Sequence, residues 1–325
     1  MVAIACEQTN PGNLVVSNNV AYWTNYASAT SGGAIMSVST SGGIPKVVEA
    51  NQDYPWGIAT DGTNLYWTNY DQAGANPGTG GPTGLTTATA GAVLQAPIAG
   101  GAPKTLASGL TTPFGIATDG TNVYFTAGLA NGSGAGAVKK VAVGGTTVTT
   151  LDQSLNGPAY ITVSGADVYW SNFGGATIRK IASNLTGPGT SVVLACNTAA
   201  VTIGPLGLVV NTGGTAVFYA DWNNGNIFSV PTTPAGACGL GTKIASDSSL
   251  TPWGIATDGT NVYFANQEGS SLESVVVAGG TATKLTTSTI ENPTGVAVDA
   301  NGVYVTGQGT TPGSATGHIW MISPP

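Results

Sequence analysis

The sequence predicts an all-β protein, a seven-bladed β-propeller with four antiparallel strands per blade and an N-terminal strand that closes the last blade. Three observations support this prediction. One sequence module occurs seven times, and each copy divides into four short strand-like runs. The last copy lacks its fourth run, and the first residues of the chain resemble that missing run.

Each module begins at a proline and continues through a strand, a turn and a second strand. The second copy reads PWGIATDGTNLYWTNY and the sixth reads PWGIATDGTNVYFANQ. The seven copies begin near Pro11, Pro55, Pro113, Pro158, Pro205, Pro252 and Pro293. The intervals between these prolines are 44, 58, 45, 47, 47 and 41 residues, which is the spacing of propeller blades. We therefore expect residues 1–325 to form a single propeller domain.

Turn chemistry separates the strands within a module. In the second copy, residues 57–60 form the inner strand A, and residues 65–68 form strand B. Residues 61–64, Asp-Gly-Thr-Asn, form the turn between them, because Gly adopts positive φ and Asp bonds its own backbone. Strand C is expected at runs such as residues 34–38, 138–143 and 227–230, and the outer strand D at runs that start at Pro45, Pro103 and Thr283.

The two ends of the chain complement each other. The seventh module supplies strands A and B and a strand C at residues 318–322, and then the sequence ends without a strand D. Residues 2–6, VAIAC, match the strand D sequence SVVLAC that begins at Ser191. We expect residues 2–6 to pair with the last blade, which removes two exposed sheet edges and makes the first eight residues important for stability.

Charge is sparse. The sequence has 8 basic and 15 acidic residues among 325, with a net charge of −7, so nucleic acid is an improbable partner. Four of the eight basic residues fall at the start of a strand D, where we interpret them as guards against sheet-to-sheet aggregation. They are Lys46, Lys104, Lys243 and Lys284.

No membrane span or signal peptide is expected. Residues 191–210 are uncharged, but Asn197, Gly204 and Pro205 interrupt them and they fit the repeat register. Only five residues precede Cys6, and none of them is basic, so no leader is recognisable within this sequence.

The strand B motif carries a family resemblance. YWTN at residues 22–25 and 66–69 and YWSN at residues 169–172 resemble the YWTD propellers of low-density-lipoprotein-receptor ectodomains. The PxGIAxD start followed by YWT is also similar to NHL-repeat and virginiamycin B lyase propellers. The resemblance implies the fold over nearly the whole chain. Asn replaces the final Asp of the receptor motif, so we expect different hydrogen bonding between blades. The lyase family relies on a His and Glu pair near the channel, and no module here places a His there.

The end of strand A carries a carboxylate in four blades. These residues are Asp61, Asp119, Asp258 and Asp299, with Ser17, Ser164 and Asn211 at the same place in the others. A carboxylate ring could hold a cation on the axis. Each Asp, however, precedes Gly or another turn residue, so we expect them to cap the A–B turns and predict no metal site and no cofactor.

The opposite face carries aromatic and amide side chains. The D–A and B–C connections form this face, which we call the proline face. The candidate ligand-binding residues there are Trp56, Tyr70, Phe114, Asn172, Phe173, Asp221, Trp222, Trp253 and Asn266. Aromatic rings beside amides and carboxylates suit sugar rings or extended peptides. In the alternative interpretation, Trp56 and Trp253 plug the channel mouth and the Asn residues close turns. An insertion at residues 71–90 belongs to the same face, and the sequence leaves open whether it forms a lid or rim or is a disordered loop.

Few residues of the sequence are of types or in motifs that suit catalysis. The one histidine, His318, starts an outer strand, where a surface role is expected. No GxSxG or HExxH motif and no Cys–His pair occurs, so we predict no catalytic residue. Carboxylate chemistry through Asp221, Glu268 or Asp71 is the enzymatic route that remains open.

The sequence has three cysteines, so at least one of them forms no disulfide within the chain. Cys6 and Cys196 occupy the same position in blades that are not adjacent, too far apart for a disulfide. Cys196 and Cys238 lie in neighbouring blades, but the strand assignment turns them toward opposite faces. This argues against a disulfide, and the sequence leaves the question open.

The leading hypothesis is a non-enzymatic binding or scaffold propeller that presents the proline face to a glycan or to a peptide or protein. Its low-charge surface, rich in Thr, Asn and Gly, favours a secreted, periplasmic or cell-surface location. The alternatives are a lyase or hydrolase that acts at the channel mouth, and a ring-shaped building block of a surface assembly. The sequence leaves the ligand and the oligomeric state open.

Overall fold

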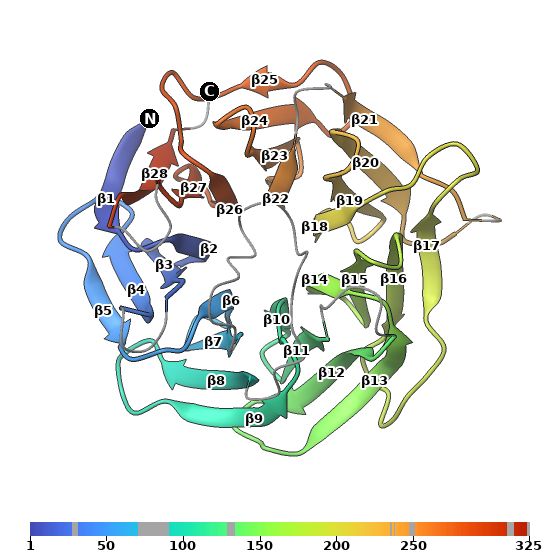
Figure 1. Cartoon of the computed structure of the whole chain (residues 1–325), viewed down its shortest axis with the longest axis horizontal. Helices are drawn as coiled ribbons and strands as arrows, with labels where there is room; N and C mark the ends of the chain where they lie inside the picture. The colour runs from blue at the N-terminus through green and yellow to red at the C-terminus, as the bar shows by residue number, and fades with distance from the viewer. Residues whose placement is uncertain are drawn as a thin grey trace.

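The chain folds into a ring of seven β-sheets around a central axis (Figure 1). The computed structural model describes residues 1–27, 32–70, 91–128, 134–234, 236, 238–246, 251–310 and 315–323. Each sheet there has four strands, and all pairings between neighbouring strands are antiparallel. The all-β, seven-bladed propeller is therefore confirmed. In the same residues no helix is long and apolar enough to cross a membrane.

Strand A of each blade lies innermost, and in six blades it starts at the proline of its module (Figure 1). The A strands are β2 (Pro11–Ser17), β6 (Pro55–Thr60), β10 (Ile116–Thr118), β14 (Pro158–Ser164), β18 (Pro205–Val210), β22 (Pro252–Thr257) and β26 (Pro293–Val298). Proline suits this position, because its missing N–H removes no ladder bond at the first residue of a strand.

Strand B is buried along nearly its whole length, since the neighbouring blades cover both of its faces. In β7 the side chains of Leu65, Tyr66 and Trp67 are all fully buried. The B strands are β3 (Val20–Asn25), β7 (Asn64–Asn69), β11 (Asn122–Ala127), β15 (Asp167–Asn172), β19 (Ala216–Asp221), β23 (Asn261–Asn266) and β27 (Val303–Gly307). The hydrophobic core therefore lies between blades.

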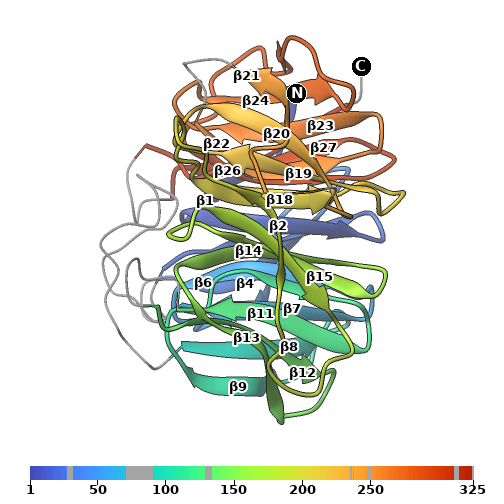
Figure 2. The same cartoon turned by 90° about the vertical axis from the view of Figure 1, so that its right-hand side faces the viewer.

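Strands C and D form the outer half of each blade. The C strands are β4 (Ala34–Ser39), β8 (Gly91–Pro97), β12 (Gly136–Ala142), β16 (Thr177–Ala182), β20 (Asn226–Pro231), β24 (Ser271–Val276) and β28 (Gly317–Ile322). The D strands are β5 (Lys46–Glu49), β9 (Lys104–Leu110), β13 (Val148–Leu155), β17 (Val192–Cys196), β21 (Thr242–Ser246), β25 (Thr283–Lys284) and, in the last blade, β1 (Val2–Gln8). Seen edge-on, the strands run between the two flat faces of the ring (Figure 2).

The N-terminal strand completes the last blade, as predicted. Strand β1 pairs with β28, with Ala3 opposite Trp320 and Ala5 opposite Ile319. Beyond this pairing, the Asn25 side-chain amide in blade 1 donates to the Gln8 side chain over 3.3 Å. The first strand of the chain therefore joins the last blade to the first (Figure 1).

The A–B turns are capped by their aspartates, as predicted. The Asp61 Oδ1 atom accepts hydrogen bonds from the backbone N–H groups of Thr63 and Asn64, at 2.8 and 2.6 Å. Its Oδ2 atom accepts the hydroxyl hydrogen of Tyr66 at 2.6 Å. The corresponding bonds recur at Asp119, Asp258 and Asp299.

The threonine of strand B bonds one blade to the next. The Thr126 hydroxyl accepts from the Gly115 N–H in its own blade at 2.9 Å and donates to the Ala159 carbonyl of blade 4 at 2.7 Å. The same donation to the following blade comes from Thr24, Thr68 and Thr306. In these four blades the Thr of the motif therefore makes a direct bond between blades.

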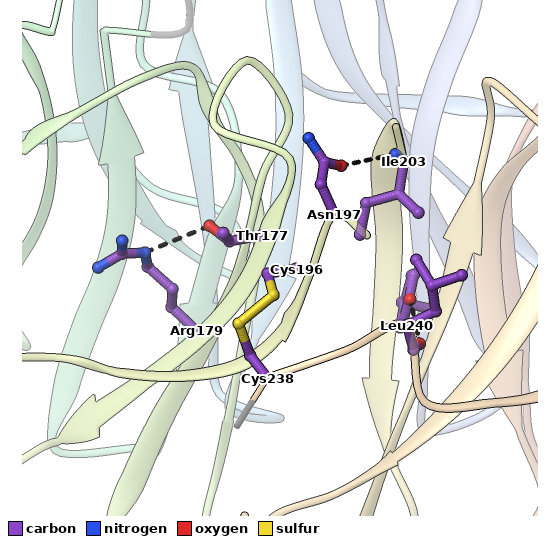
Figure 3. Close-up of a disulfide and its surroundings, with 8 residues drawn as sticks. Thr177, Arg179, Cys196, Asn197, Ile203, Cys238 and Leu240 are labelled. Carbon is purple, nitrogen blue, oxygen red and sulfur yellow. Dashed lines mark hydrogen bonds between the residues drawn. A yellow bond between two sulfur atoms is a disulfide. The ribbon is translucent and has the colours of Figure 1, made fainter. Parts of the chain in front are cut away.

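The structure overturns the expectation that Cys196 and Cys238 face apart. They form a disulfide between blades 4 and 5, with their Cα atoms 5.7 Å apart (Figure 3). The connection before β21 runs alongside the end of β17, where the Cys196 N–H donates to the Gly239 carbonyl at 3.0 Å. This parallel contact brings the two sulfur atoms to the same side. Cys6 is free and exposed.

Candidate functional site

The proline face is organised by a backbone bond within each blade. The residue that follows strand B donates its N–H to a carbonyl just before the start of strand A. Tyr70 donates to Tyr54 at 3.0 Å, Phe173 to Gly157 at 2.8 Å and Trp222 to Gly204 at 2.9 Å. These bonds place the side chains of Tyr70, Phe173 and Trp222 on one face, around the mouth of the central channel.

Most of the aromatic candidates pack into one buried cluster at the channel mouth, which we call the plug. Its fully or nearly fully buried members are Tyr26, Trp56, Tyr70, Phe114, Ala159, Leu206 and Trp253. The Trp56 ring lies 5.4 Å from the Phe114 ring and 6.5 Å from the Trp253 ring, the latter edge to face. The contacts of Trp56 and Trp253 are those of the alternative interpretation, in which these two side chains close the mouth.

Tyr160 crosses the channel beneath the plug. Its hydroxyl accepts the Trp253 indole N–H at 2.6 Å and donates to the Asn13 Oδ1 atom at 3.4 Å. Blades 4, 6 and 1 therefore meet at one hydroxyl group. Burial raises the pKa of Tyr160, and the hydrogen bond from the Trp253 indole N–H opposes that rise. The phenol stays neutral near pH 7.

The sequence contained a signal for Tyr160 that the motif analysis missed. The second residue after the proline is glycine in five blades, and the two exceptions are Asn13 and Tyr160. The glycines pack tightly, since a Cβ atom on Gly57 would lie 2.3 Å from the Phe114 carbonyl oxygen. The two blades that break this pattern contribute the side chains that meet in the channel.

The polar candidates close turns and connections. The Asp221 Oδ1 atom accepts the Gly204 N–H and its Oδ2 atom accepts the Asn224 amide, both at 2.8 Å. Asn266 accepts the N–H groups of Thr251 and Gly269, both at 3.1 Å. Asn172 is likewise buried at the start of its B–C turn.

Of the carboxylates considered for catalysis, the two that lie within the described residues have different surroundings. Asp221 is fully buried, with hydrogen bonds to both oxygens, whereas Glu268 is exposed. Asp71 and the insertion at residues 71–90 lie outside the described residues. In the part of the chain that the structure describes, no group of three or more His, Cys, Asp or Glu side chains could hold a metal ion.

His318 lies away from the plug, on the third strand of blade 7. Its ring stacks on Trp320 with the ring centres 5.2 Å apart. Both side chains, together with Thr289 and Glu291, line a surface cleft of about 240 Å³. This places the histidine on an outer strand, as expected.

Two candidate residues remain partly open to solvent on the proline face. Phe173 and Trp222 are half-buried, and their ring centres lie 6.2 Å apart with the planes inclined by 59°. Exposed Asn223 and Asn224 follow Trp222 directly. We call Phe173, Trp222 and these two asparagines the blade 4–5 platform.

The phenols of the plug do not change charge near neutral pH. Burial is the main cause that raises the pKa of Tyr26, and the neighbouring Tyr54 and Asp53 add to it. Burial and the nearby Tyr26 raise the pKa of Tyr70 in the same direction. The plug therefore presents a neutral, mainly apolar base beside the platform.

No protein-family model and no curated protein sequence matches the chain. Solved structures match its fold over nearly its full length. A streptogramin B lyase structure aligns with a TM-score of 0.69 at 15% identity, covering 98% of this chain and 96% of that chain. A virginiamycin B lyase from Staphylococcus aureus aligns with a TM-score of 0.71 at 14% identity, covering 100% and 98%. A chain of a nidogen/laminin complex aligns with a TM-score of 0.51 at 19% identity, covering 71% and 80%.

These likenesses establish the fold and agree with the resemblance in the YWTN and PxGIAxD motifs. They include propellers described as lyases and a propeller from a protein complex, so they do not select one activity. The disulfide between Cys196 and Cys238 is typical of proteins outside the cytoplasm.

Proposed function

We propose that this propeller is a non-enzymatic binding protein that uses the blade 4–5 platform of its proline face to hold a glycan or an extended peptide. The observation that supports this is the asymmetry of the face. Tyr26 and Tyr70, at the equivalent positions of blades 1 and 2, are buried, whereas Phe173 and Trp222 keep open surface. Packing of the ring alone would give equivalent positions similar exposure. Ligand binding therefore explains better why two aromatic side chains on this face stay open.

The chemistry of the platform suits a ligand with flat apolar faces and polar edges. Aromatic rings bind sugar faces and aliphatic side chains through their apolar surface, and amides supply directional hydrogen bonds. The exposed Asn223 side chain supplies such an amide, and Asn224 supplies its amide oxygen, because the Asn224 NH₂ group already donates to Thr202 and Asp221. Asp221 and its bonds to Gly204 and Asn224 hold the loop that carries Trp222.

The ligand is expected outside the cell. A secreted or surface-attached binding protein gains from a disulfide that ties its platform blades together, and Cys196 and Cys238 join blades 4 and 5. The proposal therefore includes a secreted, periplasmic or cell-surface location.

The experiment is binding of the purified protein to a glycan array and to a peptide library, which separates the two ligand classes. Phe173→Ala with Trp222→Ala should abolish the strongest binding, whereas Trp320→Ala, which truncates a half-buried Trp on an outer strand, should leave it unchanged. Thermal melts check that each variant is folded. Unchanged binding of the folded double variant would reject the platform, and binding to neither array would reject the function.

A further inference from the structure

Blades 6 and 7 enclose a cleft of about 240 Å³, which we call the blade 6–7 cleft. It is lined by Thr289 and Glu291 from the connection between β25 and β26, by Gly307 and Gly309, and by His318 and Trp320 on β28. Alternate residues of a strand point to the same face, so the rings of His318 and Trp320 share one face of β28. Ile322 continues this series and packs among blade 6 side chains. Both rings therefore face blade 6.

A glycine lets the connection from blade 6 approach β28 closely. Gly307 lies opposite His318 in the ladder between β27 and β28. A Cβ atom on Gly307 would lie 2.7 Å from the Ile290 Cγ2 atom and 3.2 Å from the Glu291 carbonyl oxygen. The same carbonyl accepts the Gly309 N–H at 3.3 Å. These contacts hold the main chain that carries Glu291 against blade 7.

The polar side chains of this cleft are not used by the fold. Four of them have no hydrogen-bond or ion-pair partner within the described residues. They are the Glu291 carboxylate, the Thr289 hydroxyl, the His318 imidazole and the Trp320 indole N–H. All four side chains are exposed or half-buried, so they reach solvent. A ligand can replace the water around them without breaking a bond of the protein.

Charge and ring geometry favour a cationic ligand. Glu291 supplies a carboxylate, and the described lining residues include no lysine or arginine. The His318 and Trp320 rings stack with their planes inclined by 23°, and tryptophan attracts cations more strongly than the other aromatic side chains. A guanidinium group suits both features, because its flat face stacks on aromatic rings and its N–H edge forms two parallel hydrogen bonds with a carboxylate.

The equivalent cleft between blades 2 and 3 lacks these features. In the register of strands B and C, Lys139 takes the place of Trp320. Thr111 takes the place of Glu291, two residues before the proline of the module. That cleft, of about 250 Å³, carries a cation in place of the indole and the carboxylate. The fold can therefore be built without the aromatic and acidic groups, so packing of the ring does not explain them in blade 7.

We propose that the blade 6–7 cleft binds the guanidinium group of an arginine side chain presented by a peptide or protein. The plane of the guanidinium lies against the open surface of the Trp320 indole, and its N–H groups donate to the Glu291 carboxylate. The Thr289 hydroxyl is a further acceptor at the rim. This site is separate from the blade 4–5 platform and does not depend on the function proposed for it.

Water is the competing occupant. The cleft is several times larger than the roughly 30 Å³ that one water molecule takes up, and its exposed polar groups give water good partners. An arginine side chain must bind better than this water. Citrulline has the shape of arginine with a neutral urea in place of the guanidinium, so the pair measures what the charge contributes.

The test adds arginine, citrulline and lysine, each acetylated and methylamidated, to the ¹⁵N-labelled full chain at about pH 8, where imidazoles of ordinary basicity are neutral. We expect arginine to shift the Trp320 indole N–H resonance in a saturable way. Citrulline should bind about 5- to 30-fold more weakly, the range for one cation–π contact with one charge-assisted hydrogen bond, and lysine should fall between the two. No saturable shift, or equal affinity for arginine and citrulline, overturns the proposal. Lysine that binds as tightly as arginine overturns the assignment to a guanidinium.

Variants localise the site by calorimetry. Glu291→Gln keeps the shape of the side chain and removes its charge, so arginine should lose most of its preference over citrulline. Glu49→Gln, which changes a carboxylate on β5 of blade 1, is the matched control and should bind arginine like the wild type. Trp320→Ala removes the stacking surface and should abolish binding. A folded Glu291→Gln protein with full affinity for arginine overturns the site.

Reciprocal variants separate this cleft from the platform. Phe173→Ala with Trp222→Ala should bind capped arginine like the wild type, whereas Trp320→Ala should lose arginine and keep the platform ligand. Loss of arginine binding in the folded platform variant would place the arginine on the platform and overturn the proposal. The comparison of the three probes on the wild-type chain decides the proposal even where a variant does not fold.

Discussion

The indole N–H of Trp253 donates a hydrogen bond to the Tyr160 hydroxyl over 2.6 Å and so joins blade 6 to blade 4 across the central channel. Hydrogen bonds such as that from Thr126 to the Ala159 carbonyl join blades that are neighbours around the ring. The bond across the axis connects blades that are not neighbours. It therefore opposes changes in the shape of the ring, because such changes alter the distance between opposite blades.

Tyr160→Phe should destabilise the protein by about 1–3 kcal/mol. The substitution removes one oxygen atom, leaves the buried Trp253 N–H without its acceptor and also removes the bond to Asn13. Urea unfolding measures the change. Tyr22→Phe is the matched control, since the Tyr22 hydroxyl forms no hydrogen bond within the described residues, and it should change stability by less than about 0.5 kcal/mol. Equal effects of the two variants would contradict a role for the cross-channel bond.

The N-terminal strand should contribute to the stability of the whole ring. Ile4 and Val2 lie on the same strand, with 4% and 64% of their surface exposed. Ile4→Ala should cost about 2–5 kcal/mol through the cavity that it leaves, and Val2→Ala should have little effect. Deletion of the first eight residues exposes the edge of β28 and should lower the melting temperature of the entire protein in one transition. A truncated chain that melts like the wild type would show that β1 adds nothing to ring stability.

The ring could be predicted from sequence because its rules are local and repeated. A proline every forty or so residues starts the A strands, and Asp-Gly turns such as that at Asp61 end them. The match between residues 2–6 and the strand D near Cys196 predicted the closure for the same reason. A pattern that recurs seven times can be recognised even where single copies differ from it.

The candidate site was harder to predict because exposure is a property of the assembled ring. Trp56 and Trp222 look alike in sequence, yet one fills the plug and the other keeps open surface. The difference depends on how strands from several blades converge on the axis. The disulfide was missed for a related reason: the connection before β21 bends back along β17, and no turn motif encodes that path.

The disulfide should stabilise the ring through the unfolded state. It closes a loop with a sequence separation of 42 residues, which in the chain-entropy model corresponds to about 4 kcal/mol. Cys196→Ala with Cys238→Ala should lower the unfolding free energy by an amount of this order, and a reductant should have the same effect on the wild type. Cys6→Ala should be neutral in both conditions, because Cys6 is free and exposed. A wild type that keeps its full stability under reductant would argue against this estimate.

The hydroxyl group of the strand B threonine should contribute to stability beyond the packing of the side chain. Thr126→Val keeps the shape but leaves the Gly115 N–H and the Ala159 carbonyl without their partner, so it should cost about 2 kcal/mol. Blades 5 and 6 carry alanine at this position, Ala220 and Ala265. Ala265→Ser offers the missing hydroxyl and should stabilise the protein by about 0.5–1.5 kcal/mol. Urea unfolding of the two variants measures the expected loss and the expected gain of stability. A Thr126→Val protein as stable as the wild type would show that the bond between blades is dispensable.

The turn aspartates should govern the acid sensitivity of the fold. Burial acts to raise the pKa of Asp61, but hydrogen bonds from Tyr66, Asn64 and Thr63 outweigh it, and the net pKa lies below the ordinary value of 3.8. The pKa values of Asp119 and Asp258 are lowered by the same kinds of contact. A carboxyl group whose pKa is lower in the folded state binds fewer protons there than in the unfolded state. Its contribution to stability is therefore complete above the ordinary value and is lost as the pH falls through the folded-state pKa.

Unfolding free energy should accordingly stay level from about pH 7 to about pH 5 and fall steeply below about pH 4. Combining Asp61→Asn, Asp119→Asn and Asp258→Asn should lower stability at neutral pH and flatten the acid slope, because the amides cannot ionise. Glu268→Gln, which changes an exposed carboxylate outside the A–B turns, should leave the slope as it is. Urea unfolding across this pH range measures all three proteins. An unchanged acid slope in the triple variant would assign the acid sensitivity to other groups. It would mean that the three carboxyl groups of the wild type bind protons equally well in the folded and unfolded states.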